Sequence, residues 1–569
     1  MERFQKYLVA LVLAFGVVGL IIGLRGFVLG ISSVPTLDAW AVFDRISNQG
    51  FSPMLGWSPY EDHRPLIPTI LSQASLWLSE TASWSAIFPQ VLTFILVVIL
   101  FSTLFYLNFD IKSQQRWEIL SFFVLILFSV VHPFNINSLL AQFRTWIGLS
   151  LFFSTVSCLL LYVAFDTSDR IRRFLVFGLC LLFAILASAT GASGLLSWGV
   201  ILVGAIAIRA NYKYNFVIVV VATLSVIAFR TRSDIGFFAD GGLTWLLHPF
   251  DYLIELSYFF GSVIGRGLFI QPFAHYSIEV SVIIGMLIIG LAFYLVIRWL
   301  LNVRKLDLAS IGIFAIIIFG LGWGFIYILK HGSVPPHPKN WIAAGDNGLV
   351  IFPMTICIIF QIYRELRRAS FKPLIFIIVL VLYAVLLPSH IFNWEQAKNE
   401  KFKWEIGLSR SITQLALTPK LNSIAHPHYG PAILNRATIE TLVKFKYPPF
   451  SDQRIRAVYT HDNIFKRFPA IEKCSNKITM TKFKSSRGLE IIFPSSQIAA
   501  NNIPMVINSS GDLIGYGVRH QKLFLRRGGI KEYAGEEIWV VPFSRNINSE
   551  NISIVLLSSN LGSVCRLVL

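Results

Sequence analysis

The sequence predicts a polytopic α-helical membrane protein of about eleven transmembrane helices, followed by a C-terminal extracytoplasmic domain that is mostly β or mixed α+β. Three observations predict this class. Charged residues make up 14% of the 569 residues, whereas soluble proteins carry about 25%. Hydrophobic residues make up 55%, and apolar runs of roughly 20 residues, long enough for a hydrocarbon core of about 30 Å, recur before residue 393. Basic residues gather between these runs.

The first apolar run is a retained anchor rather than a signal peptide. Its apolar core of about 20 residues exceeds the length of a signal-peptide core, and no small-residue cleavage site clearly follows it. The run at 174–189 is short, so a pair of half-crossing helices is the alternative there. The predicted spans are 7–30, 84–107, 117–133, 145–165, 174–189, 193–209, 215–229, 277–297, 308–329, 347–363 and 373–392.

Lys and Arg clusters occupy every second connection between these spans. By the positive-inside rule, this places the N-terminus in the cytoplasm and the C-terminus outside it. The formal net charge of +18, which in a soluble chain would suggest nucleic-acid binding, is therefore explained first by topology. The clusters are Arg3 and Lys6; Lys112 and Arg116; Arg170, Arg172 and Arg173; Arg209 and Lys213; Arg298, Arg304 and Lys305; and Arg364, Arg367, Arg368 and Lys372.

The domain division follows from the same pattern. Residues 1–392 form the predicted membrane domain, with outer loops at 31–83, 230–276 and 330–346, and residues 393–569 form the extracytoplasmic domain. In this tail the apolar runs shorten to strand length at 489–493, 537–541 and 552–557, and Gly and Asn punctuate them. Cys474 and Cys565 are its only cysteines, and the sequence leaves open whether they form a disulfide.

The sequence lacks the motifs of several common enzyme classes. There is no GxxxxGK[ST] loop, no Asp-x-Asp pair, no GxSxG elbow, and no metal-spaced Cys or His cluster. We therefore assign no metal ligands and no definite cofactor, while a divalent-metal requirement stays open. Any reaction must use a substrate that is already activated, and a substrate delivered in the membrane fits this condition.

The first outer segment holds the richest set of ionisable residues. Asp38 and Trp40 follow the first span, and Glu61, Asp62, His63 and Arg64 precede Pro65 and an apolar helix. A carboxylate there can take a proton from a hydroxyl nucleophile, and Arg64 offers a planar fork of donors to a phosphate. Spacing alone slightly favours the alternative, in which Arg64 and His63 pair with Asp62 or Glu61 as an interfacial ion cluster.

A second polar concentration lies in the outer loop after residue 329. Lys330, His331 and Lys339 stand in a Pro-stiffened loop and run against the positive-inside tendency. An anionic lipid headgroup or a pyrophosphate would explain them, and a solvated loop with lysines reaching the interface explains them equally well. Arg144 is a weaker candidate for the same cavity. In the 230–276 segment, structural roles are favoured for His248, Asp251, Glu255, Arg266 and His275.

These motifs carry a resemblance to a known superfamily. Asp38-Ala-Trp40 and Asp62-His63-Arg64-Pro65-Leu66 resemble the Asp-Asp-Trp-like and Asn-Glu-His-Arg motifs of a poorly characterised bacterial group of GT-C membrane glycosyltransferases. Leu37 stands where the first Asp of that pair would be, and Glu61-Asp62 stand where Asn-Glu would. The likeness extends loosely to 188–194 and to Tyr447-Pro-Pro-Phe450 in the tail.

The resemblance implies a transferase whose active cavity opens to the outer face of the bacterial inner membrane. It implies a polyprenyl-phosphate sugar as donor, a glycan or lipid-linked acceptor, inversion at the anomeric carbon, and no nucleic-acid partner. Asp38 is the first choice for the general base and Asp62 the second. His63 and Arg64 would orient the acceptor or bind phosphate, with Trp40 and Glu61 beside them. By location alone, Lys330, His331 and Lys339 are headgroup candidates.

Two other function classes stay open at this point. A polysaccharide polymerase or acyltransferase of the cell envelope would differ from this transferase in its donor. A non-enzymatic lipid or glycan transporter would show internal repeats with paired broken helices, and the sequence has no convincing repeat. No motif in the sequence identifies the sugar or the acceptor, and none indicates the oligomeric state.

Overall fold

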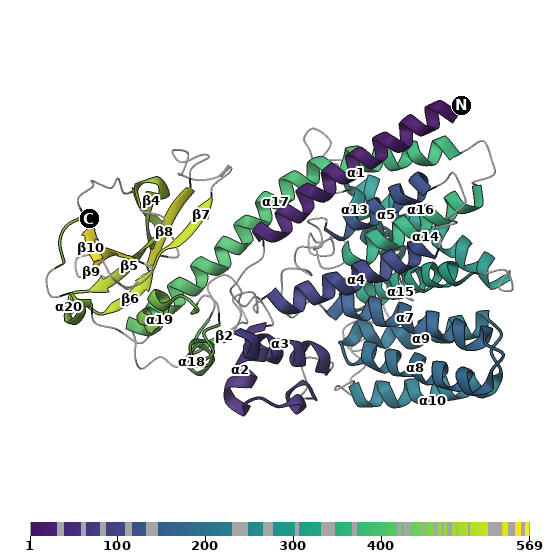
Figure 1. The fold of residues 1–569 in the computed structure, drawn as a ribbon, viewed down its shortest axis with the longest axis horizontal. Helices are drawn as coiled ribbons and strands as arrows, with labels where there is room; N and C mark the ends of the chain where they lie inside the picture. The colour runs from purple at the N-terminus through teal and green to yellow at the C-terminus, as the bar shows by residue number, and fades with distance from the viewer. Residues whose placement is uncertain are drawn as a thin grey trace. The chain divides into compact units, whose positions relative to one another are not determined.

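The computed structural model describes most of the chain as helix, with strands confined to its C-terminal part (Figure 1). The described residues are 2–30, 39–57, 64–79, 87–107, 116–131, 146–229, 248–265, 277–301, 307–331, 348–366, 372–417, 423–425, 433–447, 450–459, 464–468, 471–474, 481–485, 488–498, 501–521, 537–543, 552–558 and 564–567.

The chain divides into two compact units. The membrane unit comprises residues 1–29, 53–70 and 90–394, and the C-terminal unit comprises residues 30–52, 71–89 and 395–569. The first outer segment is therefore shared: its middle part belongs to the membrane unit, and its two flanks belong to the C-terminal unit.

Helices account for the described part of the membrane unit. They are α1 (Glu2–Gly30), α4 (Phe88–Tyr106), α5 (Arg116–Val130), α7 (Trp146–Asp166), α8 (Arg170–Ser188), α9 (Leu196–Ala207), α10 (Tyr212–Phe229), α13 (Pro249–Gly265), α14 (Ser277–Leu301), α15 (Leu308–His331), α16 (Gly348–Leu366) and the first half of α17 (Lys372–Leu417), with short 3₁₀ turns η1 (Pro53–Trp57) and η5 (Ala192–Leu195). Helix α3 (Leu66–Ser79) begins in this unit, and its residues 71–79 belong to the C-terminal unit.

Each of the eleven predicted spans coincides with one of these helices. Among the described residues, eight helices are long and apolar enough to cross a membrane: α1, α4, α7, α8, α10, α14, α15 and α16. Helices α5 and α9 are 15 and 12 residues long, and the apolar part of α17 covers only Pro373–Leu387. An integral membrane protein is thus supported, while the count of eleven stays a prediction.

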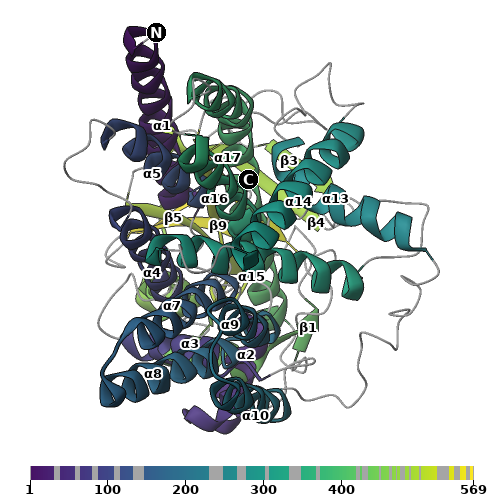
Figure 2. The same ribbon diagram turned by 90° about the vertical axis from the view of Figure 1, so that its right-hand side faces the viewer.

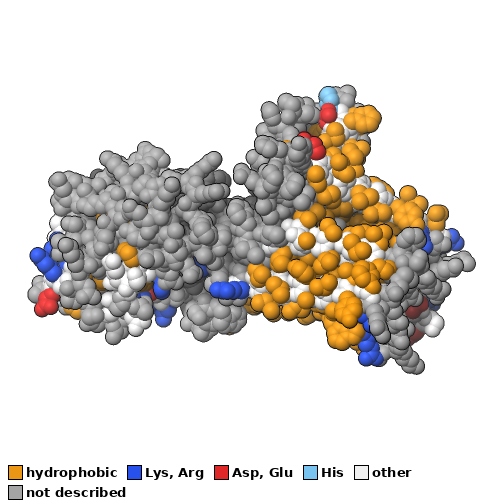
Figure 3. Space-filling model, turned by 90° about the horizontal axis from the view of Figure 1, so that it is seen from above, with side chains coloured by type: hydrophobic (Ala, Val, Ile, Leu, Met, Phe, Trp, Pro, Cys, Tyr) orange, Lys and Arg blue, Asp and Glu red, His pale blue; other side chains and the backbone are white. Residues whose placement is uncertain are grey.

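The outer surface of these helices is apolar, as a lipid environment requires. Along α14, Ile283, Leu287, Tyr294 and Ile297 recur at helical spacing and are all exposed. Figure 3 shows hydrophobic side chains covering one broad described face of the helical part, with Lys and Arg at its margin. Only 17% of the apolar window of α10 is buried, against 72% in α16, so α16 lies in the centre of the bundle.

The C-terminal unit is built around two antiparallel four-stranded sheets. One has the order β10-β9-β5-β6 and the other β3-β4-β8-β7. The predicted strands at 489–493, 537–541 and 552–557 are confirmed as β4, β8 and β9. The strands are β3 (Thr481–Ser485), β4 (Gly488–Pro494), β5 (Asn502–Asn508), β6 (Leu513–Tyr516), β7 (Val518–Gln521), β8 (Glu537–Phe543), β9 (Ile552–Ser558) and β10 (Val564–Leu567).

The core of this unit takes side chains from both sheets. Val506, Ile514 and Ile554 from the first sheet cluster with Ile491 and Val541 from the second. The structure joins Cys474 and Cys565 in a disulfide at the edge of the same cluster. The remaining elements of the unit are α2 (Ala39–Gln49), the pair β1 (Ser423–Ala425) and β2 (Ile433–Asn435), α18 (Arg436–Lys444), α19 (Gln453–Tyr459), α20 (Ile464–Arg467) and the turn η9 (Ser495–Gln497).

Candidate functional site

Most of the predicted site residues lie outside the described residues. This holds for Asp38, Glu61, Asp62, His63 and Lys339. Trp40 lies in the first turn of α2, and Lys330 and His331 end α15, but the side chains of these three residues are not described either. Among the predicted site residues, the structure describes the side chain of Arg64, and the contacts of this side chain define the candidate site.

The backbone of Arg64 is tied to helix ends from distant parts of the membrane unit. Its N–H donates to the carbonyl of Phe229, the last residue of α10, at 2.9 Å. Two residues after Pro65, the N–H of Ile67 donates to the carbonyl of Ala189, just after α8, at 3.0 Å. The start of α3 is therefore held where α8 and α10 end, and the N–H of Ile67, which has no acceptor within its own helix, is satisfied there.

Trp57 holds the guanidinium group of Arg64. Nη1 of Arg64 donates to the carbonyl oxygen of Trp57, and the guanidinium carbon lies 5.2 Å from the centroid of the Trp57 ring. That ring packs edge-on against the ring of Phe229 at 5.6 Å. A cation over an aromatic face is attracted by the ring quadrupole, so the position of the guanidinium is set from two directions.

The other edge of the guanidinium group makes no hydrogen bond to the residues that the structure describes. Nε of Arg64 is buried and has no hydrogen-bond partner among the described residues. With Nη1 committed to Trp57, Nε and Nη2 remain as a pair of parallel donors, which is the geometry that takes a carboxylate or phosphate in a bidentate manner. The arrangement can therefore receive an oxyanion.

Close packing around this position depends on two glycines. A Cβ on Gly56 would lie 2.6 Å from the Cα of Leu66, and a Cβ on Gly194 would lie 1.7 Å from the carbonyl oxygen of Ala187. Both distances are shorter than any contact that a real Cβ atom makes. Glycine is therefore required where η1 contacts the start of α3, and glycine is also required where η5 contacts the end of α8.

A buried hydroxyl network stabilises the turn after α8. The hydroxyls of Ser150 and Thr190 lie 2.5 Å apart, and Ser193 donates to Ser150 at 2.8 Å. Thr190 also donates to the carbonyl of Ala187 at 2.6 Å. All three hydroxyl side chains are fully buried and bonded, so this network is structural: it fixes the backbone that receives α3.

Contacts between helix ends sort into two sets. The ends of α8 and α10 and the start of α3 meet at Arg64, and the Trp146 ring at the start of α7 lies 5.5 Å from that of Trp323 near the end of α15. At the opposite ends, Glu118 bonds Tyr363, Arg364 pairs with Asp307 at 2.6 Å, and Arg298 pairs with Glu365. This division of helix ends into two sets agrees with the alternation of basic loops in the sequence. The assignment of one set to the cytoplasmic side stays a prediction.

Asp44, near the candidate Asp38 in the sequence, has a structural role in the C-terminal unit. The hydroxyl of Thr438 in α18 donates to Asp44 Oδ1 at 2.9 Å, and the ring of Phe43 lies 5.2 Å from that of Tyr447. These contacts anchor α2, which begins at Ala39, directly after Asp38. The Tyr447 motif noted in the sequence is thus part of the support for the segment that carries the first candidate base.

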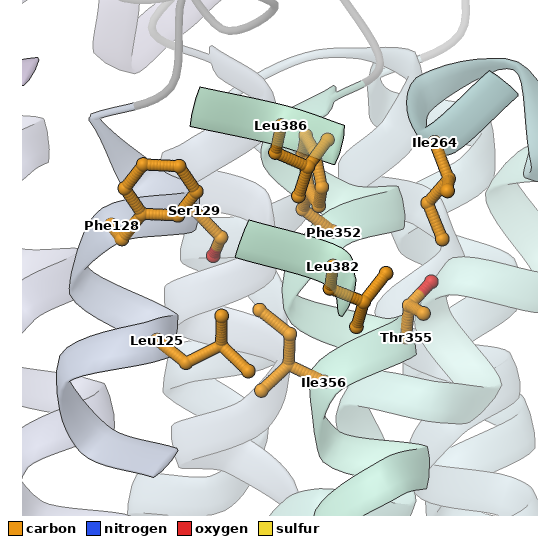
Figure 4. A pocket seen from close by; sticks show the side chains of 9 residues that line it. All are labelled: Leu125, Phe128, Ser129, Ile264, Phe352, Thr355, Ile356, Leu382 and Leu386. Atoms are coloured by element: carbon orange, nitrogen blue, oxygen red, sulfur yellow. The ribbon is translucent and has the colours of Figure 1, made fainter. Parts of the chain in front are cut away.

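A small cavity among α5, α13, α16 and α17 is apolar and does not extend the site (Figure 4). The two hydroxyls on its wall are used by their own helices: Ser129 donates to the carbonyl of Ile126 and Thr355 to that of Ile351. The cavity therefore offers no polar group to a sugar or a phosphate.

Within the described residues, no three His, Cys, Asp or Glu side chains converge to hold a metal ion. His248, just before α13, pairs with Asp251 in its first turn at 3.6 Å. Arg144, Arg266 and His275 lie outside the described residues. Sequence reasoning missed Trp57 and Phe229. In the sequence, Trp57 follows a glycine and stands seven residues before Arg64. This pattern is also found around tryptophans that merely anchor a helix at the membrane interface, so it could not identify Trp57 as a site residue.

No protein-family model, no curated protein and no solved structure matches this chain. The function must therefore be argued from the residues and their geometry.

Proposed function

We propose that this protein is a membrane glycosyltransferase that moves a sugar from a polyprenyl-phosphate donor to a glycan or lipid-linked acceptor at the outer face of the membrane. The observation that supports it best is Arg64, whose guanidinium group is held by Trp57 and whose buried Nε has no hydrogen-bond partner in the described part of the chain. This oxyanion-binding edge lies two residues after the candidate base Asp62 in the sequence.

The reaction needs one base and one stabilised leaving group. A carboxylate, Asp38 first and Asp62 second, takes the proton of the acceptor hydroxyl, whose oxygen attacks the anomeric carbon from the face opposite the phosphate. The bond between that carbon and the phosphate oxygen breaks, and the polyprenyl phosphate leaves with the electron pair. Arg64 stabilises the charge that develops on the phosphate, and inversion follows from the single displacement.

The remaining candidates have binding roles in this proposal. Trp40, Glu61 and His63 orient the acceptor near the base. Lys330, His331 and Lys339 attract the anionic headgroup of the carrier lipid, because cations at an interface favour phosphate. The protein works in the bacterial inner membrane with its C-terminal domain in the periplasm.

The test compares surface glycans by mass spectrometry in a deletion strain that carries wild type, Asp38→Asn, Asp62→Asn or no copy. Asp44→Asn is the matched control, since its side chain keeps an oxygen that can accept the Thr438 hydrogen bond. Membrane levels are equalised by immunoblot. We expect one sugar residue to be present with wild type and the control, and missing from the deletion and from one of the two other variants.

Identical glycans in all strains, together with no sugar transfer by the purified folded protein from any polyprenyl-phosphate sugar offered, would overturn the proposal. Loss of the sugar in the Asp44→Asn control as well would mean that the glycan change reports folding rather than chemistry.

A further inference from the structure

Three stretches of the C-terminal unit that are far apart in the sequence meet at one point. The ring of Phe51, just after α2, lies 5.0 Å from the ring of Phe445, just after α18. The hydroxyl of Ser79, the last residue of α3, donates to the carbonyl of Phe445 at 2.8 Å. Gln73, in the same helix, donates to the carbonyl of Ser52 at 2.8 Å. The end of α3 therefore lies beside the ends of α2 and α18, and Figure 2 shows α2 and α3 side by side.

Large aromatic side chains are exposed at this point. Phe51 is 45% exposed and Trp77 is 68% exposed. Trp77 lies one turn after Gln73 on the same face of α3, and this is the face that bonds Ser52, the neighbour of Phe51. Single exposed apolar residues are common on proteins, whereas exposed rings that gather on one surface mark a place of contact.

Two exposed lysines border these rings. Nζ of Lys444 lies 5.8 Å from the centroid of the Phe445 ring. Lys446 ends α18 in the left-handed backbone conformation, with φ at 52°, and the N–H of Tyr447 closes the turn by donating to the carbonyl of Leu442 at 2.9 Å. Glycine adopts this helix-ending conformation with the least strain. A lysine in its place puts a second positive charge beside the rings at some cost in backbone strain.

We refer to Phe51, Trp77, Lys444 and Lys446 together as the aromatic–basic patch. Aromatic rings and lysines are the side chains that favour the boundary of a bilayer, where rings enter the headgroup layer and lysines reach lipid phosphates. The chain also joins this region to helices able to cross a membrane, α1 before it and α4 after it. Helix α4 begins about nine residues after α3 ends, a link that reaches at most about 30 Å.

We propose that the aromatic–basic patch binds the surface of the bilayer, with Phe51 and Trp77 in the headgroup layer and Lys444 and Lys446 on the phosphates of anionic lipids. A lipid surface is favoured over a partner protein because the two charges match anionic headgroups and because the chain is joined to spans on both sides of the patch. The contact would hold the end of α2 at the membrane interface. The inference goes beyond the proposed function and does not depend on sugar transfer.

The test locates a spin label relative to the bilayer. Full-length protein with Gln49→Cys, at an exposed position next to the patch, is labelled and placed in nanodiscs of phosphatidylcholine, with or without phosphatidylglycerol. The five native cysteines do not interfere, because three are buried and two are joined in the disulfide. Electron paramagnetic resonance then compares access of oxygen, which concentrates in lipid, with access of a nickel chelate, which stays in water. Ser509→Cys, exposed in the turn between β5 and β6, is the control label.

We expect the label at position 49 to favour oxygen in anionic nanodiscs and the label at position 509 to favour nickel. Lys444→Gln and Lys446→Gln should each lower the ratio of membrane-bound to free label at position 49 by about fivefold, because each removes one charge near an anionic surface. Lys473→Gln, at an exposed lysine outside the patch, is the matched control and should leave this ratio unchanged.

A label at position 49 that is as accessible to nickel as the label at position 509 in both lipid mixtures would overturn the proposal. Shielding that is the same in both mixtures and in the two lysine variants would also overturn it, because such shielding indicates a protein contact, for example with a second copy of the chain. Neither result bears on sugar transfer, which is measured separately.

Discussion

Thr438 donates a 2.9 Å hydrogen bond to the carboxylate of Asp44, which lies 394 residues earlier in the chain. The bond joins α18 to α2 within the C-terminal unit, and the Phe43–Tyr447 ring contact lies beside it. An outer segment that follows the first span is thus held by residues of the tail. This anchoring sets the position of α2, whose first residue Ala39 follows Asp38 in the sequence.

Loss of this bond should loosen α2. Thr438 is almost fully buried, so Thr438→Val removes this buried hydrogen bond to Asp44 and is expected to lower the stability of the docked helix by about 1 kcal/mol. Hydrogen exchange of the α2 amides should accelerate about tenfold, while the exchange of β5 and β9 stays unchanged. Thr441→Val, which removes a bond within α18 itself, is the control. Equal exchange of α2 in wild type and Thr438→Val would contradict the anchoring.

The bidentate edge of Arg64 predicts that lysine cannot replace arginine there. Arg64→Lys keeps the charge but loses the parallel Nε and Nη2 donors, so sugar transfer should fall by about tenfold to 100-fold. Trp57→Leu, which removes the ring under the guanidinium, should raise the KM for the donor more than it lowers kcat. Arg173→Lys, at a half-buried site where Arg173 donates to the Thr167 carbonyl, should leave transfer unchanged. An Arg64→Lys enzyme as active as wild type would exclude bidentate binding.

The α13–α14 contact predicts a strong response to a single methyl group. Gly285→Ala places a Cβ 1.6 Å from a backbone carbonyl, so the helices must separate, and we expect a loss of about 2–4 kcal/mol in stability. Gly290→Ala, in the same helix, meets no atom within 4 Å and should be neutral or slightly stabilising. Thermal unfolding of the two purified variants in detergent compares them directly. Similar melting temperatures would show that the two helices are not in close contact.

The disulfide should stabilise the C-terminal unit. It closes a loop of 91 residues, which corresponds to about 4.6 kcal/mol in the chain-entropy model. Cys474→Ser and Cys565→Ser should each lower the unfolding temperature of this unit, and the double variant should be no worse than either single one. Alkylation followed by peptide mass spectrometry should label both cysteines only after reduction. Labelling of both in the unreduced folded protein would contradict the bond.

Glu405, in the part of α17 that belongs to the C-terminal unit, predicts a pH dependence of stability. Burial raises the pKa of its carboxyl above the ordinary value, and nearby Lys401 offsets this in part. A folded-state pKa above the unfolded one means that the folded state binds the proton more tightly. The contribution is therefore fully present below the unfolded pKa of about 4.3 and is lost as the pH rises through the folded pKa.

Glu405→Gln removes the carboxyl and should raise the stability of the unit at neutral pH, with no change below about pH 4. Denaturant unfolding of the wild type and the variant across the pH range measures the difference between them. A difference that grows toward acid pH, rather than toward neutral pH, would have the wrong sign for a raised pKa.

Much of the helical architecture could be predicted from local pattern. The spans at 145–165 and 308–329 appear as α7 and α15, because their apolar runs are long and bounded by charged residues. The alternation of basic loops also predicts which helix ends meet, and Arg364–Asp307 and Arg64–Phe229 fall in separate sets accordingly. Asp38 and Asp62 lie outside the described residues, so their roles remain predictions.

The rest of the candidate site depends on contacts that no local pattern encodes. Trp57 and Phe229 carry the same apolar signal as many interface aromatics, and only their packing around Arg64 distinguishes them. The close approach of α13 to α14, where Gly285 meets the backbone of Ser257, likewise has no counterpart in the local sequence pattern.

The sequence by itself therefore determined the membrane class, the positions of the apolar helices and three strands of the tail, β4, β8 and β9, since hydropathy and turn chemistry act over neighbouring residues. The tertiary structure alone decided that the first outer segment is divided between two compact units, that Trp57 holds Arg64, and that α13 lies along α14. The physical reason is that these relations join residues far apart in the chain, whose contacts are selected by close packing and by the satisfaction of buried polar groups.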